Sequence, residues 1–368
     1  MLLRTPATGK KAKSTLIGIA LTALALTASA CAHATTSTAS APSSGSTGTA
    51  AATLRLGYFA NVTHTTPIVG VANGFYTQKL GSTKLTTQIF ASGSPEMTAL
   101  LGGKLDAAYV GPSSALTAYL QSKGSALKII AGAESGGAEL VVNSSITTAA
   151  QLKGQTIADP QLGNTQDVAL RYWLKQQGYT TTQQGGGDVK IEPTANSTTL
   201  SLFEQGKIQG AWVPEPWASR LITEGGGHVL VDEKSLWPGG QFTTTELVVN
   251  TAYLTAHPQT VTELLEGQIA ANTWILANPD QAQTVVNTQL PKLSGSALKP
   301  AEIARSWTEE TVTNDPLADT LSTELAHAVA DGLEGSSSID GIFDLTPLNA
   351  ALKADGQPAV SSDNLGPQ

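Results

Sequence analysis

Cysteine and charged side chains are scarce in this chain. Only one of its 368 residues is a cysteine, Cys31, so neither an internal disulfide nor a metal site built from several thiolates can form. Charged residues make up 14% of the sequence, and the formal net charge is −8. Because nucleic-acid binding needs a basic surface, nucleic acid is not an expected partner.

Motifs for metal or cofactor chemistry are also missing. The five histidines are scattered without the spacing of metal ligands, and neither an HExxH motif nor a Gly-Lys-Ser/Thr phosphate loop occurs. We therefore expect no catalytic residue, no metal and no cofactor, and a role in binding without turnover.

Residues 1–31 have the order of segments that is typical of a secretory signal peptide. Four basic residues and no acid precede an apolar run at 16–26, which is too short for a permanent membrane span. Ala28-Ser29-Ala30 then leads into Cys31, which resembles a bacterial lipobox, although leucine is commoner at the position of Ala28. We expect lipidation of Cys31, with plain secretion as the alternative. Cleavage would leave 17 basic and 29 acidic residues, a net charge of −12.

Residues 32–53 contain small and polar residues without Asp, Glu, Lys, Arg or any large apolar side chain. Such a segment cannot form a core, so it is predicted to be a flexible tether between the lipid anchor and the folded part.

From Leu54 onward, short strand-like runs alternate with helical patterns, which indicates an α/β protein with a mostly parallel sheet covered on both faces. Residues 97–112 align without gaps with residues 200–215, each as a helix, a Gly-Lys turn and a buried strand. Two Rossmann-like lobes are therefore expected, with a ligand cleft between them at the carboxyl ends of the strands. The expected division is 54–142 plus 246–352 for lobe 1, 143–245 for lobe 2 and 353–368 for a polar tail, with a strand at 243–249 crossing back to lobe 1.

The turn at 159–167 has the features of an anion site. It joins a strand at 155–158 to a helix whose apolar face repeats with helical spacing. Gly163 allows the turn, Asn164 is a favoured N-cap, and Asp167 can close the cap reciprocally. The free amides of the first turn and the helix dipole favour an oxyanion there. An ordinary capped helix is the alternative.

Several motifs together resemble a known family. They are TQDVALRYWLK at 165–175, WVPEPWA at 212–218, LDAAYVGP at 105–112 and NDP at 314–316. In this order they resemble the extracytoplasmic solute-binding proteins of ABC importers that bind aliphatic sulfonates, taurine and nitrate, over residues 54–352. The resemblance implies a type II periplasmic-binding-protein fold with two lobes joined by two crossovers. It also implies a monomeric, extracytoplasmic, lipid-anchored protein that delivers a small anion to a membrane permease.

The ligand loops of that family correspond here to a set of predicted ligand-binding residues: His64, Gly93, Ser94, Gly111, Pro112, Ser113, Ser114, Gly163, Asn164, Thr165, Gln166, Glu215 and Trp217. These loops offer hydroxyls, amides and a histidine but no Lys or Arg, whereas carboxylate and phosphate sites often recruit an arginine fork. A singly charged oxyanion, and first of all an aliphatic sulfonate, is therefore the expected ligand. Taurine, nitrate and a thiamine-precursor pyrimidine are the alternatives.

Some of these residues have a second interpretation. Trp217 is expected either to contact an alkyl chain or to pack in the core, and His64 is expected to be a ligand donor or a capping residue. Glu215 and Asp159 would repel an anion unless paired or protonated, so Glu215 either holds a neighbouring loop or meets a ligand amine.

A serine hydrolase is the alternative from another class. Gly111-Pro-Ser-Ser-Ala115 resembles a nucleophile elbow with Ser113 as nucleophile and with His228 or His257 downstream. The proline before Ser113 and the lack of a matching acid count against it.

Overall fold

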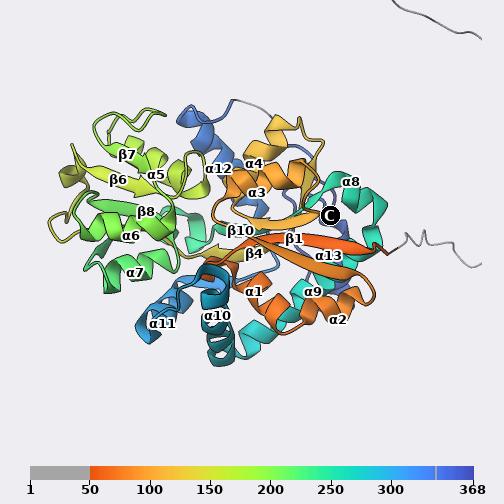
Figure 1. Cartoon of the computed structure of the whole chain (residues 1–368). Helices are drawn as coiled ribbons and strands as arrows, with labels where there is room; N and C mark the ends of the chain where they lie inside the picture. Colours follow the sequence, from red (N-terminus) through yellow and green to blue (C-terminus); the bar gives the residue numbers. More distant parts are fainter. Residues whose placement is uncertain (1–49, 336–337) are drawn as a thin grey trace, which may run out of the picture. The chain divides into compact units, whose positions relative to one another are not determined.

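The computed structural model describes residues 50–335 and 338–368, which form two β-sheets flanked by helices (Figure 1). The predicted α/β class is thereby confirmed. The signal segment, Cys31 and most of the predicted tether lie outside the described residues. Within the described ranges, no helix is long and apolar enough to cross a membrane.

The first sheet has six strands in the order β11-β4-β10-β3-β1-β2. Their bounds are β1 (Thr53–Phe59), β2 (Lys84–Phe90), β3 (Ala107–Val110), β4 (Leu127–Gly136), β10 (Thr243–Asn250) and β11 (Glu310–Val312). Residues 243–249 of β10 are all buried, as expected for a strand covered on both faces. The prediction that this strand returns from the second half of the chain to the first sheet is confirmed.

The second sheet has five strands in the order β7-β6-β8-β5-β9. Their bounds are β5 (Ala138–Val142), β6 (Thr156–Asp159), β7 (Lys190–Pro193), β8 (Gly210–Pro214) and β9 (His228–Asp232). Leu140 and Trp212 face one hydrophobic cluster, whereas Val141 and Val213 face another. This alternation shows that both faces of the sheet are covered. We call each sheet with its covering helices a lobe.

Two features of the sheets differ from the sequence-based expectation. Both sheets are mixed, because β10 runs antiparallel to β3 and β4, and β5 runs antiparallel to β8 and β9. In addition, β5 pairs in the second sheet, although residues up to 142 were assigned to lobe 1. The chain changes sheets at Gly136-Gly137, a short glycine turn between two largely buried strands.

Helices cover both faces of each sheet (Figure 1). The first sheet carries α3 (Gly93–Leu101) and α4 (Pro112–Gln121) on one side and α1 (Thr65–Ala72), α2 (Phe75–Leu80), α9 (Pro258–Ala277) and α13 (Thr346–Ala354) on the other. The second sheet packs against α5 (Thr165–Gln176) on one face and against α6 (Asn196–Glu204) and α7 (Trp217–Thr223) on the other. The 3-10 turns are η1 (Val62–His64), η2 (Ala149–Leu152), η3 (Glu233–Leu236) and η4 (Pro238–Gly240).

The remaining helices are α8 (Thr251–Ala256), α10 (Pro279–Ser294), α11 (Pro300–Glu309) and α12 (Ala318–Ala330). Helices α11 and α12 come after β10, the strand that returns the chain to the first lobe. Both nevertheless contact the second lobe. Helix α11 packs against α7, and α12 lies between α4 and α5 (Figure 1). Each lobe is thus held by the C-terminal helices as well as by the crossover strands.

The C-terminal residues are more ordered than the predicted polar tail. The amides of Phe343 and Leu345 donate to the carbonyls of Leu365 and Pro367, at 3.2 and 2.8 Å. Leu365 also packs against the core of the first lobe. The sequence analysis missed this pairing because the few apolar residues of the segment are spaced irregularly, without a period that marks an element.

Candidate functional site

Strands from both sheets end at a small cavity of about 30 Å³ between the lobes. The first lobe supplies residues after β1, β2 and β3 and from β10: Phe59, Asn61, Thr63, His64, Ala91, Ser92, Gly93, Gly111, Ser114, Thr244 and Thr245. The second lobe supplies residues after β6, β7 and β8: Pro160, Asn164, Thr165, Gln166, Asn196 and Pro214. We call this space the central cavity. Ligands of α/β proteins bind at the carboxyl ends of strands, which makes it the candidate site.

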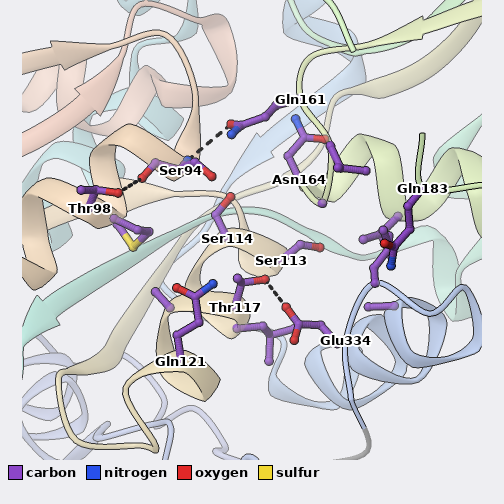
Figure 2. Close-up of a pocket in the computed structure, with 18 of the residues that line it drawn as sticks. Ser94, Thr98, Ser113, Ser114, Thr117, Gln121, Gln161, Asn164, Gln183 and Glu334 are labelled. Carbon is purple, nitrogen blue, oxygen red and sulfur yellow. Dashed lines mark hydrogen bonds between the residues drawn. The ribbon is translucent and has the colours of Figure 1, made fainter. Parts of the chain in front are cut away.

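A larger cavity of about 330 Å³, the side cavity, adjoins the central one and shares Ser114 and Asn164 with it (Figure 2). Its walls come from α3 and α4, from the loop and helix start at 161–168, and from residues 328–334 at and after the end of α12. The amide of Ser94 donates to Gln161 Oε1 at 3.4 Å across the boundary between the lobes (Figure 2).

Most of the predicted site residues border one of these cavities. The central cavity is lined by His64, Gly93, Gly111, Ser114, Asn164, Thr165 and Gln166, and the side cavity adds Ser94, Ser113 and Gly163. The other three, Pro112, Glu215 and Trp217, line neither. Pro112 is the first residue of α4, a position that suits its fixed φ angle, so it shapes the helix start.

Glu215 belongs to a buried ion-pair network and lies outside both cavities. Arg305 of α11 donates to Glu215 Oε1 at 2.5 Å and to both carboxylate oxygens of Glu139 at 2.7 Å. Ser219 and Ser306 also donate to Glu215, at 3.0 and 2.9 Å. Burial raises the pKa of Glu215, although the Arg305 charge opposes that effect. Of the two interpretations for Glu215, the structure therefore supports holding a loop in place.

Trp217 acts on the cavity through a neighbour. Its Nε1 donates to Asn61 Oδ1 at 3.0 Å, and Asn61 lines the central cavity from the first lobe. The indole therefore joins the two lobes and orients a cavity residue, while its ring lies under the guanidinium of Arg220 at 5.0 Å.

The start of α5 has the predicted Asn164 cap, but Asp167 closes it on Gly163 and not on the amide of Asn164 itself. Asn164 Oδ1 accepts from the amide of Asp167 at 2.9 Å, and Asp167 Oδ2 accepts from the amide of Gly163 at 2.8 Å. Asp167 is itself held by Arg171, whose Nε lies 2.7 Å from Asp167 Oδ1. The cap uses one amide of the first turn, which leaves those of Thr165 and Gln166 for a ligand.

Besides α5, the helices α3, α4 and α6 begin at the central cavity. The first residues of α3, α5 and α6 are Gly93, Thr165 and Asn196, and the residue before α4 is Gly111; all four line the cavity. Each helix directs the positive end of its dipole toward the same space. None of the described residues that line the central cavity is charged at neutral pH.

Two side-chain atoms at the cavity also lack partners within the part of the chain that the structure describes: Thr165 Oγ1 and Asn196 Oδ1. A buried hydroxyl or amide without a partner is costly unless a ligand or water satisfies it. Amides, hydroxyls and helix dipoles without a cationic side chain make a site for a small, weakly charged anion.

His64 is buried and neutral. Its Nδ1 accepts from the amide of Phe59 at 3.3 Å, so the ring proton resides on Nε2. Burial lowers the pKa of His64 to about 3, which keeps the imidazole uncharged at physiological pH. The residue can therefore donate one hydrogen bond but contributes no positive charge.

Two buried acids lie close to the cavity without lining it. Asp159 ends β6 directly before Pro160, and Glu96 lies in the first turn of α3. Neither carboxyl oxygen of Glu96 has a hydrogen-bond partner among the described residues. Burial raises the pKa of Asp159 and of Glu96 well above the ordinary values, and the neighbouring Asp167 raises that of Asp159 further. Burial therefore favours the uncharged form of each acid, which reduces the negative charge beside the site.

Ser113 lacks the surroundings of a catalytic nucleophile. Its Oγ hydrogen-bonds Glu324 of α12. His228 lies in β9 of the second sheet, and His257 packs against Tyr253 at a ring distance of 5.0 Å. The arrangement of a nucleophile next to a histidine base, which defines a serine hydrolase, is therefore not formed by these residues.

Sequence analysis missed several cavity residues. Thr63 follows a buried strand, and Thr244 and Thr245 lie within one. Threonine is common in strands, so these residues do not by themselves indicate a binding site. Asn196 was detectable, because it lies at the start of a helix shortly after a strand, as Asn164 does at the cap of α5. Gln161 lies in the predicted turn at 159–167 but was not singled out there. The residues around Leu333 approach the side cavity from an element distant in sequence, so no local pattern marks them.

Comparisons with known proteins agree with this geometry. Residues 48–289, more than half of the chain, match the model of the NMT1-like family. A Brucella abortus protein whose name describes it as a binding protein is 25% identical over 259 residues, 70% of this chain and 77% of that protein.

Solved structures with the same fold extend over most of the chain. The alkanesulfonate-binding protein from Xanthomonas axonopodis pv. citri, bound to MOPS, superposes with a TM-score of 0.64 at 21% identity, covering 77% of this chain and 94% of its own. The periplasmic nitrate-binding protein from Synechocystis superposes with a TM-score of 0.65 at 15% identity, covering 85% and 86%. The type II periplasmic-binding-protein fold expected from the sequence is confirmed, and the chain belongs to the NMT1-like family.

Proposed function

We propose that this protein is the substrate-binding component of an ABC importer, and that it captures an aliphatic sulfonate in the central cavity for delivery to a membrane permease. The observation that carries this proposal is the meeting of the starts of α3, α4, α5 and α6 at a cavity whose described lining is uncharged. Such a site attracts an anion through amides and dipoles alone.

The absence of cations among the described lining residues selects the type of anion. A carboxylate or phosphate site commonly uses Arg or Lys, which neutralise a localised charge through short, charge-assisted bonds. A sulfonate carries one charge over three oxygen atoms and only accepts hydrogen bonds, so it suits amide and hydroxyl donors. Thr165 Oγ1 and the free amides of α5 are donors of this kind. The names of the alkanesulfonate- and nitrate-binding structures with the same fold support this choice.

The cell location follows from the amino-terminal sequence. Lipidation of Cys31 would hold the protein at the outer face of a membrane through the 32–53 segment, as a monomer near its permease. We propose no enzymatic activity, since Ser113 hydrogen-bonds Glu324 and no histidine of the described residues is hydrogen-bonded to it.

A ligand panel tests the proposal. Purified residues 50–368 are titrated by calorimetry and thermal shift with ethanesulfonate, taurine, nitrate, sulfate and a thiamine-precursor pyrimidine. Ethanesulfonate at 100 times its Kd should raise the melting temperature by on the order of 5 °C, because ligand binding stabilises the native state by mass action. Sulfate, a dianion, should bind much more weakly. Binding of nitrate or the pyrimidine alone would transfer the proposal to that ligand, and no response to any of them would reject it.

A further inference from the structure

We propose that the side cavity is a second subsite for the same ligand, so that the substrate is an extended aminosulfonate: its sulfonate lies in the central cavity, its alkyl stem in the side cavity and its amine near Glu334. This inference rests on the proposed function and names the substrate class more closely. It also separates this protein from one that carries nitrate or methanesulfonate.

The first observation is the size of the space. The side cavity measures about 330 Å³, compared with about 30 Å³ for the central cavity. Protein interiors are close-packed, and pockets for organic ligands begin at roughly 300 Å³. An inorganic anion would need only the central cavity and would leave the larger space unfilled.

The second observation is that the two cavities are adjacent. Ser114 and Asn164 line both, so they form the wall between them (Figure 2). Ser114 packs so closely on Gly93 that a Cβ at position 93 would lie 2.1 Å from Ser114 Oγ. The wall therefore consists of small groups. Rotation of the Ser114 side chain changes this wall without any movement of a helix.

The third observation is the chemistry of the side-cavity walls. Met97, Leu101, Leu116, Val168 and Leu333 supply apolar surface for an alkyl stem. Glu334 is the one charged side chain among the described residues that line this cavity, and it hydrogen-bonds Thr117 of α4 (Figure 2). A carboxylate at this place favours a cationic group on the ligand.

The length of the stem follows from helix geometry. Ser114 at the shared wall and Thr117 beside Glu334 are three residues apart on α4, which is roughly 4.5 Å along the helix axis. The lining continues to Gln121, roughly 10 Å from Ser114 by the same measure. A stem of several bonds therefore separates the sulfonate from the amine, and taurine is too short to use this length fully.

The side cavity also depends on the second lobe. Lys175 Nζ donates to the carbonyl of Ala330, and Gln183 Nε2 donates to that of Gly332, which ties the end of α12 to the second lobe. The cavity is thus complete only when the first lobe, the second lobe and α12 are together, as expected for a space that forms around a ligand.

The experiment is a calorimetric titration of residues 50–368 with methanesulfonate, hexane-1-sulfonate and 6-aminohexane-1-sulfonate. Wild type should bind hexane-1-sulfonate at least about tenfold more tightly than methanesulfonate, since each buried methylene adds affinity, and should bind the amine more tightly still. Glu334→Gln should remove the preference for the amine and leave hexane-1-sulfonate unchanged. Glu204→Gln, an exposed glutamate on α6 outside both cavities, is the matched control.

A second variant fills the cavity. Thr98 is exposed on α3, lines the side cavity and donates Oγ1 to the carbonyl of Ser94. Thr98→Trp should cancel the advantage of the two long ligands and leave methanesulfonate binding intact. Thr255→Trp is its control, because Thr255 on α8 is equally exposed and makes the same bond to Thr251.

The outcomes separate the two proposals. If methanesulfonate binds and the longer ligands bind no better, or if Thr98→Trp weakens all three equally, the second subsite is rejected while the proposed function stands. If no sulfonate of any length binds, the proposed function is rejected and the subsite with it. Should Thr98→Trp fail to fold, the chain-length series on wild type and the Glu334→Gln titration still decide.

Discussion

Gly111 and Thr165 meet across the boundary between the two lobes, and a Cβ at position 111 would lie 2.6 Å from Thr165 Oγ1. Gly111 ends the β3 side of the central cavity, and Thr165 begins α5 on the opposite side. The two lobes therefore close on each other through backbone and a hydroxyl, with no room for one methyl group. This contact lies directly at the proposed anion site.

Gly111→Ala should weaken sulfonate binding by at least about tenfold while leaving the ligand-free protein folded. The φ angle at Gly111 is −70°, so alanine causes no backbone strain, and the cost arises only when the lobes close. A ligand whose binding requires the two lobes to close then binds more weakly. Calorimetry measures the affinity, and X-ray scattering measures the ligand-induced decrease in radius of gyration, which should shrink or vanish.

The double variant Gly111→Ala with Thr165→Ala serves as the control, since it removes the atom that the new methyl would strike. It should regain the scattering change that Gly111→Ala loses. Wild-type affinity and compaction in Gly111→Ala alone would show that the contact does not limit closure.

Arg305 should be essential for stability. It is the shared partner of Glu139 and Glu215, and both carboxylates are almost fully buried. Arg305→Met leaves these two acids without their cation, which should reduce the free energy of unfolding by about 3 kcal/mol. Urea unfolding followed by tryptophan fluorescence measures the change. The control is Lys234→Met, because Lys234 pairs with Glu309 at 2.9 Å at a more exposed position and should cost less than about 1 kcal/mol. Equal losses in the two variants would contradict the importance of the buried network.

Stability should fall as pH rises from about 4.5 to about 7. Burial raises the pKa of Glu324 from 4.5 to about 7, so in this range the folded state keeps a proton that the unfolded state has released. The unfolded state binds fewer protons, and the free energy of unfolding therefore decreases with pH. Glu134, Glu139 and Glu233, with pKa values raised to about 8, 7 and 8, act in the same direction. His64 and His327, with pKa values lowered to about 3 and 4, oppose this trend below about pH 6.5, but the four carboxyl groups outnumber them.

Glu324→Gln tests this directly, since glutamine keeps a partner for Ser113 without titrating. Urea unfolding at pH 5 and pH 8 should show a smaller difference for the variant than for wild type. A wild type that is more stable at pH 8 than at pH 5 would show that the sign is wrong.

The proposed lipid anchor at Cys31 is tested by cell fractionation. Wild-type protein should partition with membranes, because an acyl-modified cysteine after the signal segment retains it there. Cys31→Ser should remain unprocessed or enter the soluble fraction. The same distribution for both would leave plain secretion as the explanation.

Local features of the site were predictable from sequence, because capping signals act within a few residues. Gly163, Asn164 and Asp167 form the expected turn and cap. Much of the order of strands and helices was predictable for the same reason, since hydrophobic periodicity reports on burial of each element, but the strand β5 was not predicted.

Long-range contacts were not predictable. Glu215 meets Arg305 from 90 residues away, and Ser113 meets Glu324 from 211 residues away. Those pairings place Glu215 in an ion-pair network and give Ser113 a carboxyl neighbour. The side cavity was not predictable either, because its walls come from elements far apart in the sequence: α3, α4, the start of α5 and the end of α12.

The most direct test of the central claim, that backbone amides at the start of α5 hold the sulfonate, compares Thr165→Pro with Thr165→Val. Proline deletes the amide but is tolerated at the first helical position, and the extended φ and ψ of Asn164, −81° and 174°, suit a following proline. Valine keeps the amide and loses only the hydroxyl. Calorimetric titration with ethanesulfonate should show at least about tenfold weaker binding for Thr165→Pro than for Thr165→Val, since a hydrogen bond to a charged group contributes roughly 1.5 to 3 kcal/mol. Equal affinities in two folded variants would contradict the claim and leave α5 as a capped helix without a ligand.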